Sequence, residues 1–258
     1  MKPVLVVYKP VGATPLEMVK KVKQTYPEYA QVKIGYAGRL DPMAEGLLLL
    51  LVGEENKNKL AYESLPKTYT IKILFGIETD TGDILGLVTN SQRIENLEAL
   101  LTQASKIITA LPGTHDQISP HYSARRYQGK PLYYWARRGL SPKTGQPKKR
   151  ITIIETNIGD KRSIDAIDIE TSVTRRIAQV SGNFRQEDIL ISWQQSLHAL
   201  GNAAFPILGV TITCTSGTYM RAIAQSVGGS LGVPSLAWTI KRDKIGPYTS
   251  TDADPRIV

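Results

Sequence analysis

Residues 35–52 read GYAGRLDPMAEGLLLLLV, a glycine-punctuated turn that runs directly into six apolar residues. The apolar run is too short to cross a membrane and is bounded by glycines, which is typical of a strand buried on both faces. Asp41 therefore stands where the chain enters a buried element. An ionised carboxylate is costly to bury there unless a cation meets it. Alternatively, Asp41 caps a short helical turn that has Pro42 at its first position.

The net charge of +9 originates in one segment of the chain. Residues 125–150 contain nine basic residues and no acidic one, whereas the rest of the chain holds 23 of each sign. Aromatic residues from Tyr122 to Trp135 lie among them, and this mixture of cations and flat rings favours single-stranded or looped RNA. A solvated basic helix is the alternative. The nine basic residues are Arg125, Arg126, Lys130, Arg137, Arg138, Lys143, Lys148, Lys149 and Arg150.

Hydrophobic periodicity predicts an α+β fold with a mixed, largely antiparallel central sheet flanked by helices. The glycine motif of dinucleotide-binding folds is missing from the sequence. We expect a single domain over residues 1–258, with a projecting basic arm at about 120–150. Strands are predicted near 3–8, 47–52, 67–76, 151–158 and 207–214, with shorter ones at 84–90, 165–180 and 236–243, and helices at 15–25, 54–64, 94–107, 130–139, 186–198 and 218–231.

Several other chemistries find little support in the sequence. His115, His121 and His198 lack paired-ligand spacing, so no metal site is expected. The serine-hydrolase elbow and the phosphate-binding Walker loop do not occur. The single cysteine, Cys214, lies in an apolar stretch, and the N-terminus does not read as a signal peptide, so we expect a cytoplasmic protein without an internal disulfide framework.

Two residues far along the chain have properties that bear on Asp41. Tyr69 shares a strand face with apolar residues, so its ring is either part of the core or a platform for a nucleobase. Arg221 lies in the first turn of a predicted helix, where the helix dipole disfavours a cation. We therefore expect Arg221 to have a carboxylate partner, for which a planar guanidinium is well suited.

Glu45 and an acidic segment further along the chain have more modest interpretations. Glu45 invites a two-carboxylate glycosidase mechanism, but Gly46 and Pro42 disrupt a regular helix between the two acids, so Glu45 is interpreted as structural. Residues 79–86, TDTGDILG, are either a turn or half of a metal loop, and they lack the ligand spacing of a calcium site.

Seven motifs, taken in order, resemble the TruB family of tRNA pseudouridine synthases, and they extend over nearly the whole chain. The resemblance implies the pseudouridine synthase fold and an isomerase that converts uridine to pseudouridine at position 55, in the T loop of tRNA. The motifs are Lys9-Pro10-x-Gly12-x-Thr14, Gly38-x-Leu40-Asp41-Pro42-x-Ala44-x-Gly46-x-Leu48, Gly53-Glu54-x-x-Lys57, Lys67-x-Tyr69, Thr79-Asp80-Thr81-x-Asp83, Tyr122-Ser123-Ala124-x-x-x-x-Gly129 and Gly217-Thr218-Tyr219-x-Arg221.

The resemblance also assigns roles to individual residues. It makes Asp41 the catalytic aspartate, Arg221 its partner and Tyr69 the ring that stacks on the target uracil, with Tyr219 beside the base. Tyr36 stands where family members usually carry histidine, and residues at about 159–206 are longer than the corresponding family segment, which makes them an insertion without an assigned role. The substrate-binding residues expected from the resemblance are Tyr36, Lys57 and Ile240, to which the basic arm adds Arg125, Arg126, Lys130, Lys148, Lys149 and Arg150.

The implied reaction breaks the N1 glycosidic bond of a flipped-out uridine, turns the ring and joins C5 to the same sugar carbon. The aspartate either forms a covalent bond to the sugar or the uracil ring, or removes a sugar proton, and both routes stay open. The resemblance implies no cofactor, no metal and no membrane; we expect a monomer that binds the T-arm of tRNA and lacks the C-terminal PUA domain of many relatives. Two alternatives remain: a synthase acting on ribosomal or other RNA, and an RNA-binding or RNA-folding protein whose catalysis is incidental.

Overall fold

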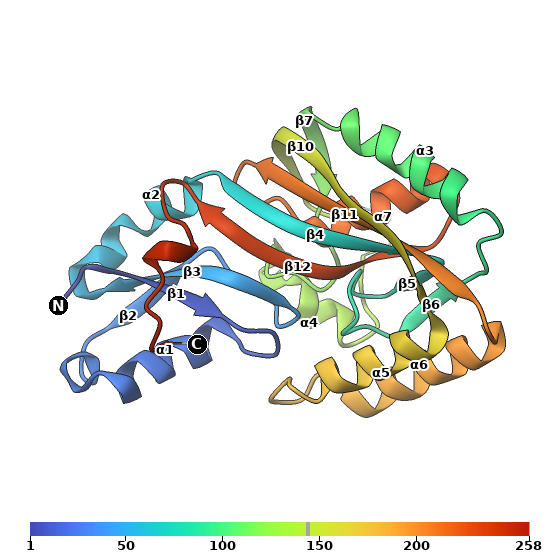
Figure 1. The fold of residues 1–258 in the computed structure, drawn as a ribbon. Coiled ribbons are helices and arrows are strands. Elements are labelled where there is room, and N and C mark those ends of the chain that lie inside the picture. The colour runs from blue at the N-terminus through green and yellow to red at the C-terminus, as the bar shows by residue number, and fades with distance from the viewer. Residues whose placement is uncertain (143–144, 258) are drawn as a thin grey trace.

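An eight-stranded sheet forms the centre of the computed structural model, which describes residues 1–142 and 145–257 (Figure 1). The strand order is β1-β3-β12-β4-β11-β10-β7, with β2 also paired to β3; β12 and β3 are parallel and the other pairs are antiparallel. The predicted mixed, largely antiparallel α+β sheet is confirmed. The strands are β1 Val4–Lys9, β2 Ile34–Ala37, β3 Ala44–Val52, β4 Lys67–Phe75, β7 Gly113–Ile118, β10 Lys148–Asp165, β11 Ala204–Cys214 and β12 Ser235–Ile245; the hairpins β5 Ile77–Thr79 with β6 Val88–Ser91, and β8 Arg126–Tyr127 with β9 Lys130–Pro131, lie outside the sheet.

Helices cover both faces of the sheet because its central strands are apolar on both sides. In β11, Val210 and Ile212 pack toward α3 and α7, whereas Phe205 and Ile207 pack toward α5 and α6 (Figure 1). No helix in the described ranges is long and apolar enough to span a bilayer. The helices are α1 Pro15–Thr25, α2 Lys59–Ser64, α3 Leu97–Thr109, α4 Leu132–Ala136, α5 Ala166–Ile177, α6 Gln186–Leu200 and α7 Met220–Leu231, with 3-10 turns η1 Pro27–Tyr29, η2 Gly53–Asn58 and η3 Ser250–Asp252.

The leucine run forms β3, and the prediction of a doubly buried strand is confirmed. Leu48 and Leu50 pack against α1, and the alternate leucines pack on the opposite side, with residues 47–51 at most 1% exposed. Gly46 begins this burial with a φ of +111°. A Cβ atom there would lie 2.3 Å from the carbonyl oxygen of Arg242, so the close parallel approach of β12 requires glycine.

The predicted strand at 165–180 is wrong, because this segment forms helix α5. Ile169, Val173 and Ile177 recur at helical spacing and are buried against the sheet. Asp165 caps the helix, since its side chain accepts a hydrogen bond from the backbone nitrogen of Asp168 at 2.8 Å. This acidic cap and the four-residue spacing are helix signals that outweigh the β-branched composition of the segment.

Other differences concern short elements. The expected helix at 54–64 begins as a 3-10 turn and becomes α2, the one at 130–139 shrinks to α4, and the strand at 84–90 is replaced by the shorter β6. Strands β2 and β7 were not expected; β7 is an edge strand with mostly exposed polar side chains, so it has no apolar periodicity to detect. The basic arm is described only in part, because residues 143 and 144, and with them the basic residue Lys143, lie outside the described residues.

Candidate active site

The catalytic candidate Asp41 lies in a tight turn between β2 and β3. The backbone nitrogen of Ala44 donates to the carbonyl oxygen of Asp41 at 3.0 Å, and that of Gly12 donates to the carbonyl oxygen of Pro42 at 2.8 Å. The turn leads into a strand, so the helix-cap alternative for Asp41 is wrong. Nearby Glu45 accepts a hydrogen bond from the hydroxyl group of Tyr8 at 2.7 Å, which is consistent with its structural interpretation.

Arg221 connects three separate parts of the chain at this turn. Its Nε donates to Oδ2 of Asp41 at 2.8 Å, while its terminal nitrogens donate to the carbonyl oxygens of Thr81 at 2.5 Å and Tyr122 at 3.0 Å. The guanidinium is 3% exposed, whereas the Asp41 side chain is 39% exposed. The expected carboxylate partner of Arg221 is therefore present. Asp41 is partly exposed to solvent, whereas the arginine with which it pairs is buried.

A second carboxylate, Asp83, lies behind Arg221. Its Oδ2 is 3.8 Å from the Nε of Arg221, and its Oδ1 accepts from the hydroxyl group of Thr81 and the backbone nitrogen of Leu85, each at 2.9 Å. Burial raises the pKa of Asp83, and Arg221 counteracts this rise. Burial alone would lower the pKa of Arg221, but Asp41 and Asp83 together raise it. The TDTGD motif, residues 79–83, is thus a turn that contacts Arg221 through the carbonyl oxygen of Thr81 and the carboxylate of Asp83.

Apolar and aromatic side chains border the acidic turn. Tyr69 in β4 and Ile240 in β12 belong to one buried cluster with Leu40, the neighbour of Asp41, and are 9% and 6% exposed. Burial raises the pKa of Tyr69, and the charge of Asp41 adds to this rise. Tyr219 immediately precedes α7, and Gln117 in β7 holds its backbone through two hydrogen bonds of 2.8 and 3.1 Å. Tyr69 and Ile240 therefore border the acidic turn, and Tyr219 lies two residues before Arg221.

Three buried cations support the strands beneath the turn. Lys9 is fully buried and donates to the carbonyl oxygens of Pro10 and Ala13 at 2.9 and 2.8 Å, and more weakly to that of Pro42. Lys67 donates to two carbonyl oxygens at 2.6 Å each. Arg242 is 1% exposed, and in the described part of the chain its hydrogen bonds run to the carbonyl oxygens of residues 38, 39 and 47, on both sides of Asp41.

The two buried lysines should make the protein more stable in mildly alkaline solution. Burial lowers the pKa of Lys9 to about 8 and that of Lys67 to about 8, from 10.5 in each case. Between pH 8 and pH 10.5 the unfolded chain binds more protons than the folded one, so the free energy of unfolding rises with pH over this range, by up to about 3 kcal/mol per lysine. Urea unfolding from pH 7 to about 9.5 measures this, before the tyrosines titrate. Lys67→Met should reduce the rise, and a flat or falling profile in wild type would contradict the prediction.

Two expected substrate-binding residues lie outside this cluster. Tyr36 in β2 packs beside α1, with the ammonium group of Lys59 5.7 Å from its ring centroid. Lys57, in η2, is 77% exposed and forms an ion pair with Glu54. The structure therefore does not bring Lys57 to Asp41, although its exposure leaves it accessible to a large ligand.

The basic arm leaves the sheet between the paired ends of β7 and β10, where the backbone nitrogen of Ser119 donates to the carbonyl oxygen of Pro147 at 2.9 Å. Its carbonyl oxygen at Tyr122 is the one that accepts from Arg221, so the arm begins at the candidate site. Lys149 differs from its neighbours, because it is half-buried and donates to the carbonyl oxygen of Ser216 at 2.5 Å. The exposed basic candidates are Arg125, Arg126, Lys130, Lys148 and Arg150.

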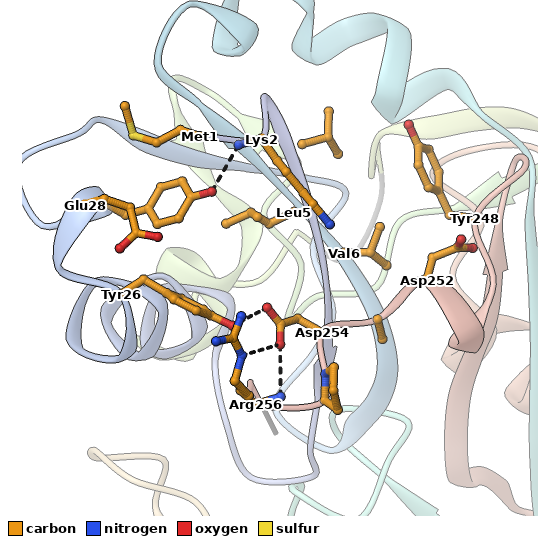
Figure 2. Close-up of a pocket in the computed structure, with 14 residues that line it drawn as sticks. Met1, Lys2, Leu5, Val6, Tyr26, Glu28, Tyr248, Asp252, Asp254 and Arg256 are labelled. Carbon is orange, nitrogen blue, oxygen red and sulfur yellow. Dashed lines mark hydrogen bonds and ion pairs between the residues drawn. The ribbon is translucent and has the colours of Figure 1, made fainter.

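A separate surface hollow lies between the first residues of the chain and the segment 252–256 (Figure 2). Met1, Tyr26 and Tyr248 help to line it, together with Asp254 and Arg256, which form an ion pair. None of the predicted site residues lines this hollow. In the described ranges, no group of three or more His, Cys, Asp or Glu side chains is arranged to hold a metal ion.

Sequence reasoning missed three residues that shape the site: Lys9, Asp83 and Arg242. Each was either part of a motif without an assigned role or not considered at all. The signal was weak because an isolated charged residue in a sequence is usually exposed, and its burial depends on strands that are distant in the chain.

Comparison with known proteins identifies the family to which the chain is similar. A family model described as "TruB family pseudouridylate synthase (N terminal domain)" matches residues 23–177. The tRNA pseudouridine synthase B of Bordetella avium is 28% identical over 246 residues, which cover 95% of this chain and 82% of that protein. The Bacillus subtilis protein of the same name is 30% identical over 95% of this chain and 66% of its own length, and that of Psychrobacter arcticus is 29% identical over 53% of its length.

A solved structure shows the same fold. The crystal structure of a Cbf5-Nop10-Gar1 complex contains a chain that aligns with a TM-score of 0.56 and 15% identity, over 96% of this chain and 50% of that one. The family model covers more than half of the chain, including the turn with Asp41 and the motif with Asp83. The chain belongs to the TruB family of pseudouridylate synthases.

Proposed function

We propose that this chain converts uridine to pseudouridine at position 55, in the T loop of tRNA. The observation that carries the proposal is the pair of Asp41 and Arg221, in which a half-exposed carboxylate is held at 2.8 Å by a buried guanidinium. Relatives named tRNA pseudouridine synthase B, 28–30% identical over 95% of the chain, support the choice of tRNA.

The geometry suggests how the residues would act on a flipped-out uridine. The exposed carboxylate of Asp41 would meet the sugar or the base, and the ring of Tyr69 with Ile240 would provide an apolar surface for the uracil. Asp41 would act as a nucleophile or as a base for a sugar proton. The N1–C1′ bond breaks and a C5–C1′ bond forms, while the proton leaves C5 and one is gained at N1, so atoms and electrons balance without a co-reactant.

The test uses an unmodified tRNA transcript and wild-type protein. We expect pseudouridine at position 55, mapped by chemical labelling and reverse transcription. A transcript with cytidine at that position is the matched control, and a ribosomal RNA fragment is a second substrate. Modification of the ribosomal fragment alone would reject the tRNA assignment in favour of another RNA target, and RNA binding without modification would favour a binding protein.

The basic arm should account for part of the salt dependence of RNA binding. Lys148 and Arg150 are exposed at alternate positions of β10, whereas Lys149 points to the backbone before α7. Lys148→Ala/Arg150→Ala should lower the slope of log affinity against log salt by roughly 0.7–0.9 for each phosphate that the variant no longer neutralises. Filter binding or fluorescence anisotropy at several salt concentrations measures it. Lys106→Ala/Lys161→Ala removes two exposed charges elsewhere, and an equal change in both variants would exclude the arm from the interface.

A further inference from the structure

The segment at 159–206 forms a helical hairpin that reaches the candidate active site. It comprises the end of β10, then α5 and α6, which pack side by side beneath the sheet (Figure 1). The loop between them, residues 178–185, which we call the α5–α6 loop, meets the N-terminal part of the chain. A Cβ atom at Gly12 would lie 2.4 Å from the carbonyl oxygen of Gln179, so the two backbones are in close contact. Ser181 donates a hydrogen bond to Glu17 in α1.

The last residue of the α5–α6 loop, Arg185, joins two further parts of the chain. Its guanidinium donates to Oδ2 of Asp80 at 2.9 Å and lies 4.8 Å from the ring centroid of Tyr122. The ring centroid of the preceding residue, Phe184, lies 5.6 Å from the guanidinium of Arg137 in the basic arm. The loop therefore binds both the TDTGD turn and the base of the arm.

These two contacts lead directly to Arg221. Asp80 precedes Thr81, whose carbonyl oxygen accepts from Arg221, and the other carbonyl acceptor belongs to Tyr122 itself. Asp80 is also fixed to its own turn, because its Oδ1 accepts from the backbone nitrogen of Leu87 at 2.9 Å. Arg185 thus holds both peptide segments that position the guanidinium paired with Asp41.

The local backbone conformation and the helix dipole both disfavour arginine at position 185. Its backbone is left-handed, with a φ of +64°, a conformation that a residue with a side chain adopts at a cost. It also stands at the N-terminus of α6, where the helix dipole disfavours a cation. Glycine or an acidic residue would suit the backbone or the dipole better. The tertiary contacts of Arg185 therefore act against both local preferences.

We propose that Arg185 is a positioning residue for the active site, and that the α5–α6 hairpin serves to bring it there. The guanidinium orients the Thr81 and Tyr122 carbonyl groups, and through them the Arg221–Asp41 pair. This role rests on the proposed function, because the pair has to act on RNA for its alignment to matter for turnover.

The test compares Arg185→Gly with wild type on an unmodified tRNA transcript. Glycine removes the side chain and relieves the left-handed backbone, so the melting temperature should not fall by more than about 3 °C. Turnover should fall about 10- to 100-fold, because the reacting groups lose their alignment. The Kd for RNA, measured in an Asp41→Asn background to prevent turnover, should stay within about 2-fold of its control. Arg185→Lys keeps the charge but loses the planar stack, so it should recover only part of the turnover.

Two further variants separate positioning from simple loss of charge. Arg175→Ala removes an exposed arginine from the same hairpin and should leave turnover unchanged. Asp80→Asn should reduce turnover as Arg185→Gly does, and the double variant should be no worse than the more impaired single one. Unchanged turnover in Arg185→Gly would overturn the proposal. If RNA binding were weaker while turnover stayed unchanged, Arg185 would be an RNA contact instead.

Hydrogen exchange keeps the inference distinct from the proposed function. Arg185→Gly should accelerate exchange of backbone amides in residues 79–88 and 122–135 of the free protein, with little change in α3. If wild type modifies no RNA, the proposed function fails, yet this measurement still tests whether Arg185 holds the two segments. Unaltered exchange in both segments would overturn the inference even if the enzyme is active.

Discussion

Asp41→Asn should abolish pseudouridine formation, lowering single-turnover rates by at least about 10⁴-fold, as removal of a group that bonds to or deprotonates the substrate does in other enzymes. Asparagine has nearly the same shape, and its carbonyl oxygen can still accept the hydrogen bond from Arg221. It can neither attack a sugar carbon nor take a proton at neutral pH. The measurement is pseudouridine formation, followed by tritium release from a labelled tRNA transcript with enzyme in excess.

Binding and folding provide the controls for this variant. The Asp41 side chain is 39% exposed, so the loss of its charge should change the free energy of unfolding by no more than about 1 kcal/mol, and the Kd for RNA should stay near that of wild type. Glu45→Gln is the matched control, because it neutralises a nearby carboxylate whose contact is with Tyr8. Equal losses in both variants would assign the effect to local charge, and turnover retained in Asp41→Asn would reject a chemical role for Asp41.

The elements that sequence reasoning identified correctly are those whose burial repeats along the chain. The leucine run at 47–52 and the strand at 67–76 are apolar on one or both faces, and α7 shows helical periodicity from end to end. The error at 165–180 arose where isoleucine, valine and threonine suggested a strand, although Asp165 was a cap and the apolar spacing was helical. Edge strand β7 could not be found this way, because its pairing partner determines it rather than its own side chains.

The candidate site was predictable for a different reason. Asp41 and Arg221, 180 residues apart, were each expected to need a partner of opposite charge, because an acid at a buried turn needs a cation and a cation in the first turn of a helix needs an acid; the resemblance to the TruB family then named the two as a pair. The role of Asp83 could not be obtained in this way, since its burial behind Arg221 depends on how the TDTGD turn meets α7. The same holds for Arg185, whose two contacts join segments about 60 and 100 residues before it.

Arg221→Met should have the largest combined effect on stability and activity. The guanidinium is buried, and its removal leaves Asp83, with a side chain 7% exposed, without the cation that offsets its burial. Breaking a buried pair from one side costs about 3–5 kcal/mol, measured here by urea unfolding, and turnover should be lost as in Asp41→Asn.

The pH dependence and a second substitution identify Asp83 as the cause of that instability. Burial raises the pKa of Asp83, and loss of Arg221 removes the charge that opposes the rise. A carboxyl group with a raised pKa in the folded state stabilises that state below its unfolded pKa, and this stability is lost as pH rises through the folded pKa. Arg221→Met should therefore lose more stability at neutral pH than near pH 5.

Adding Asp83→Asn should restore much of the stability at neutral pH without restoring turnover, because the neutral amide needs no cation while Asp41 still lacks its partner. Equal destabilisation at both pH values, with no recovery in the double variant, would show that lost packing rather than an unpaired carboxylate destabilises the protein.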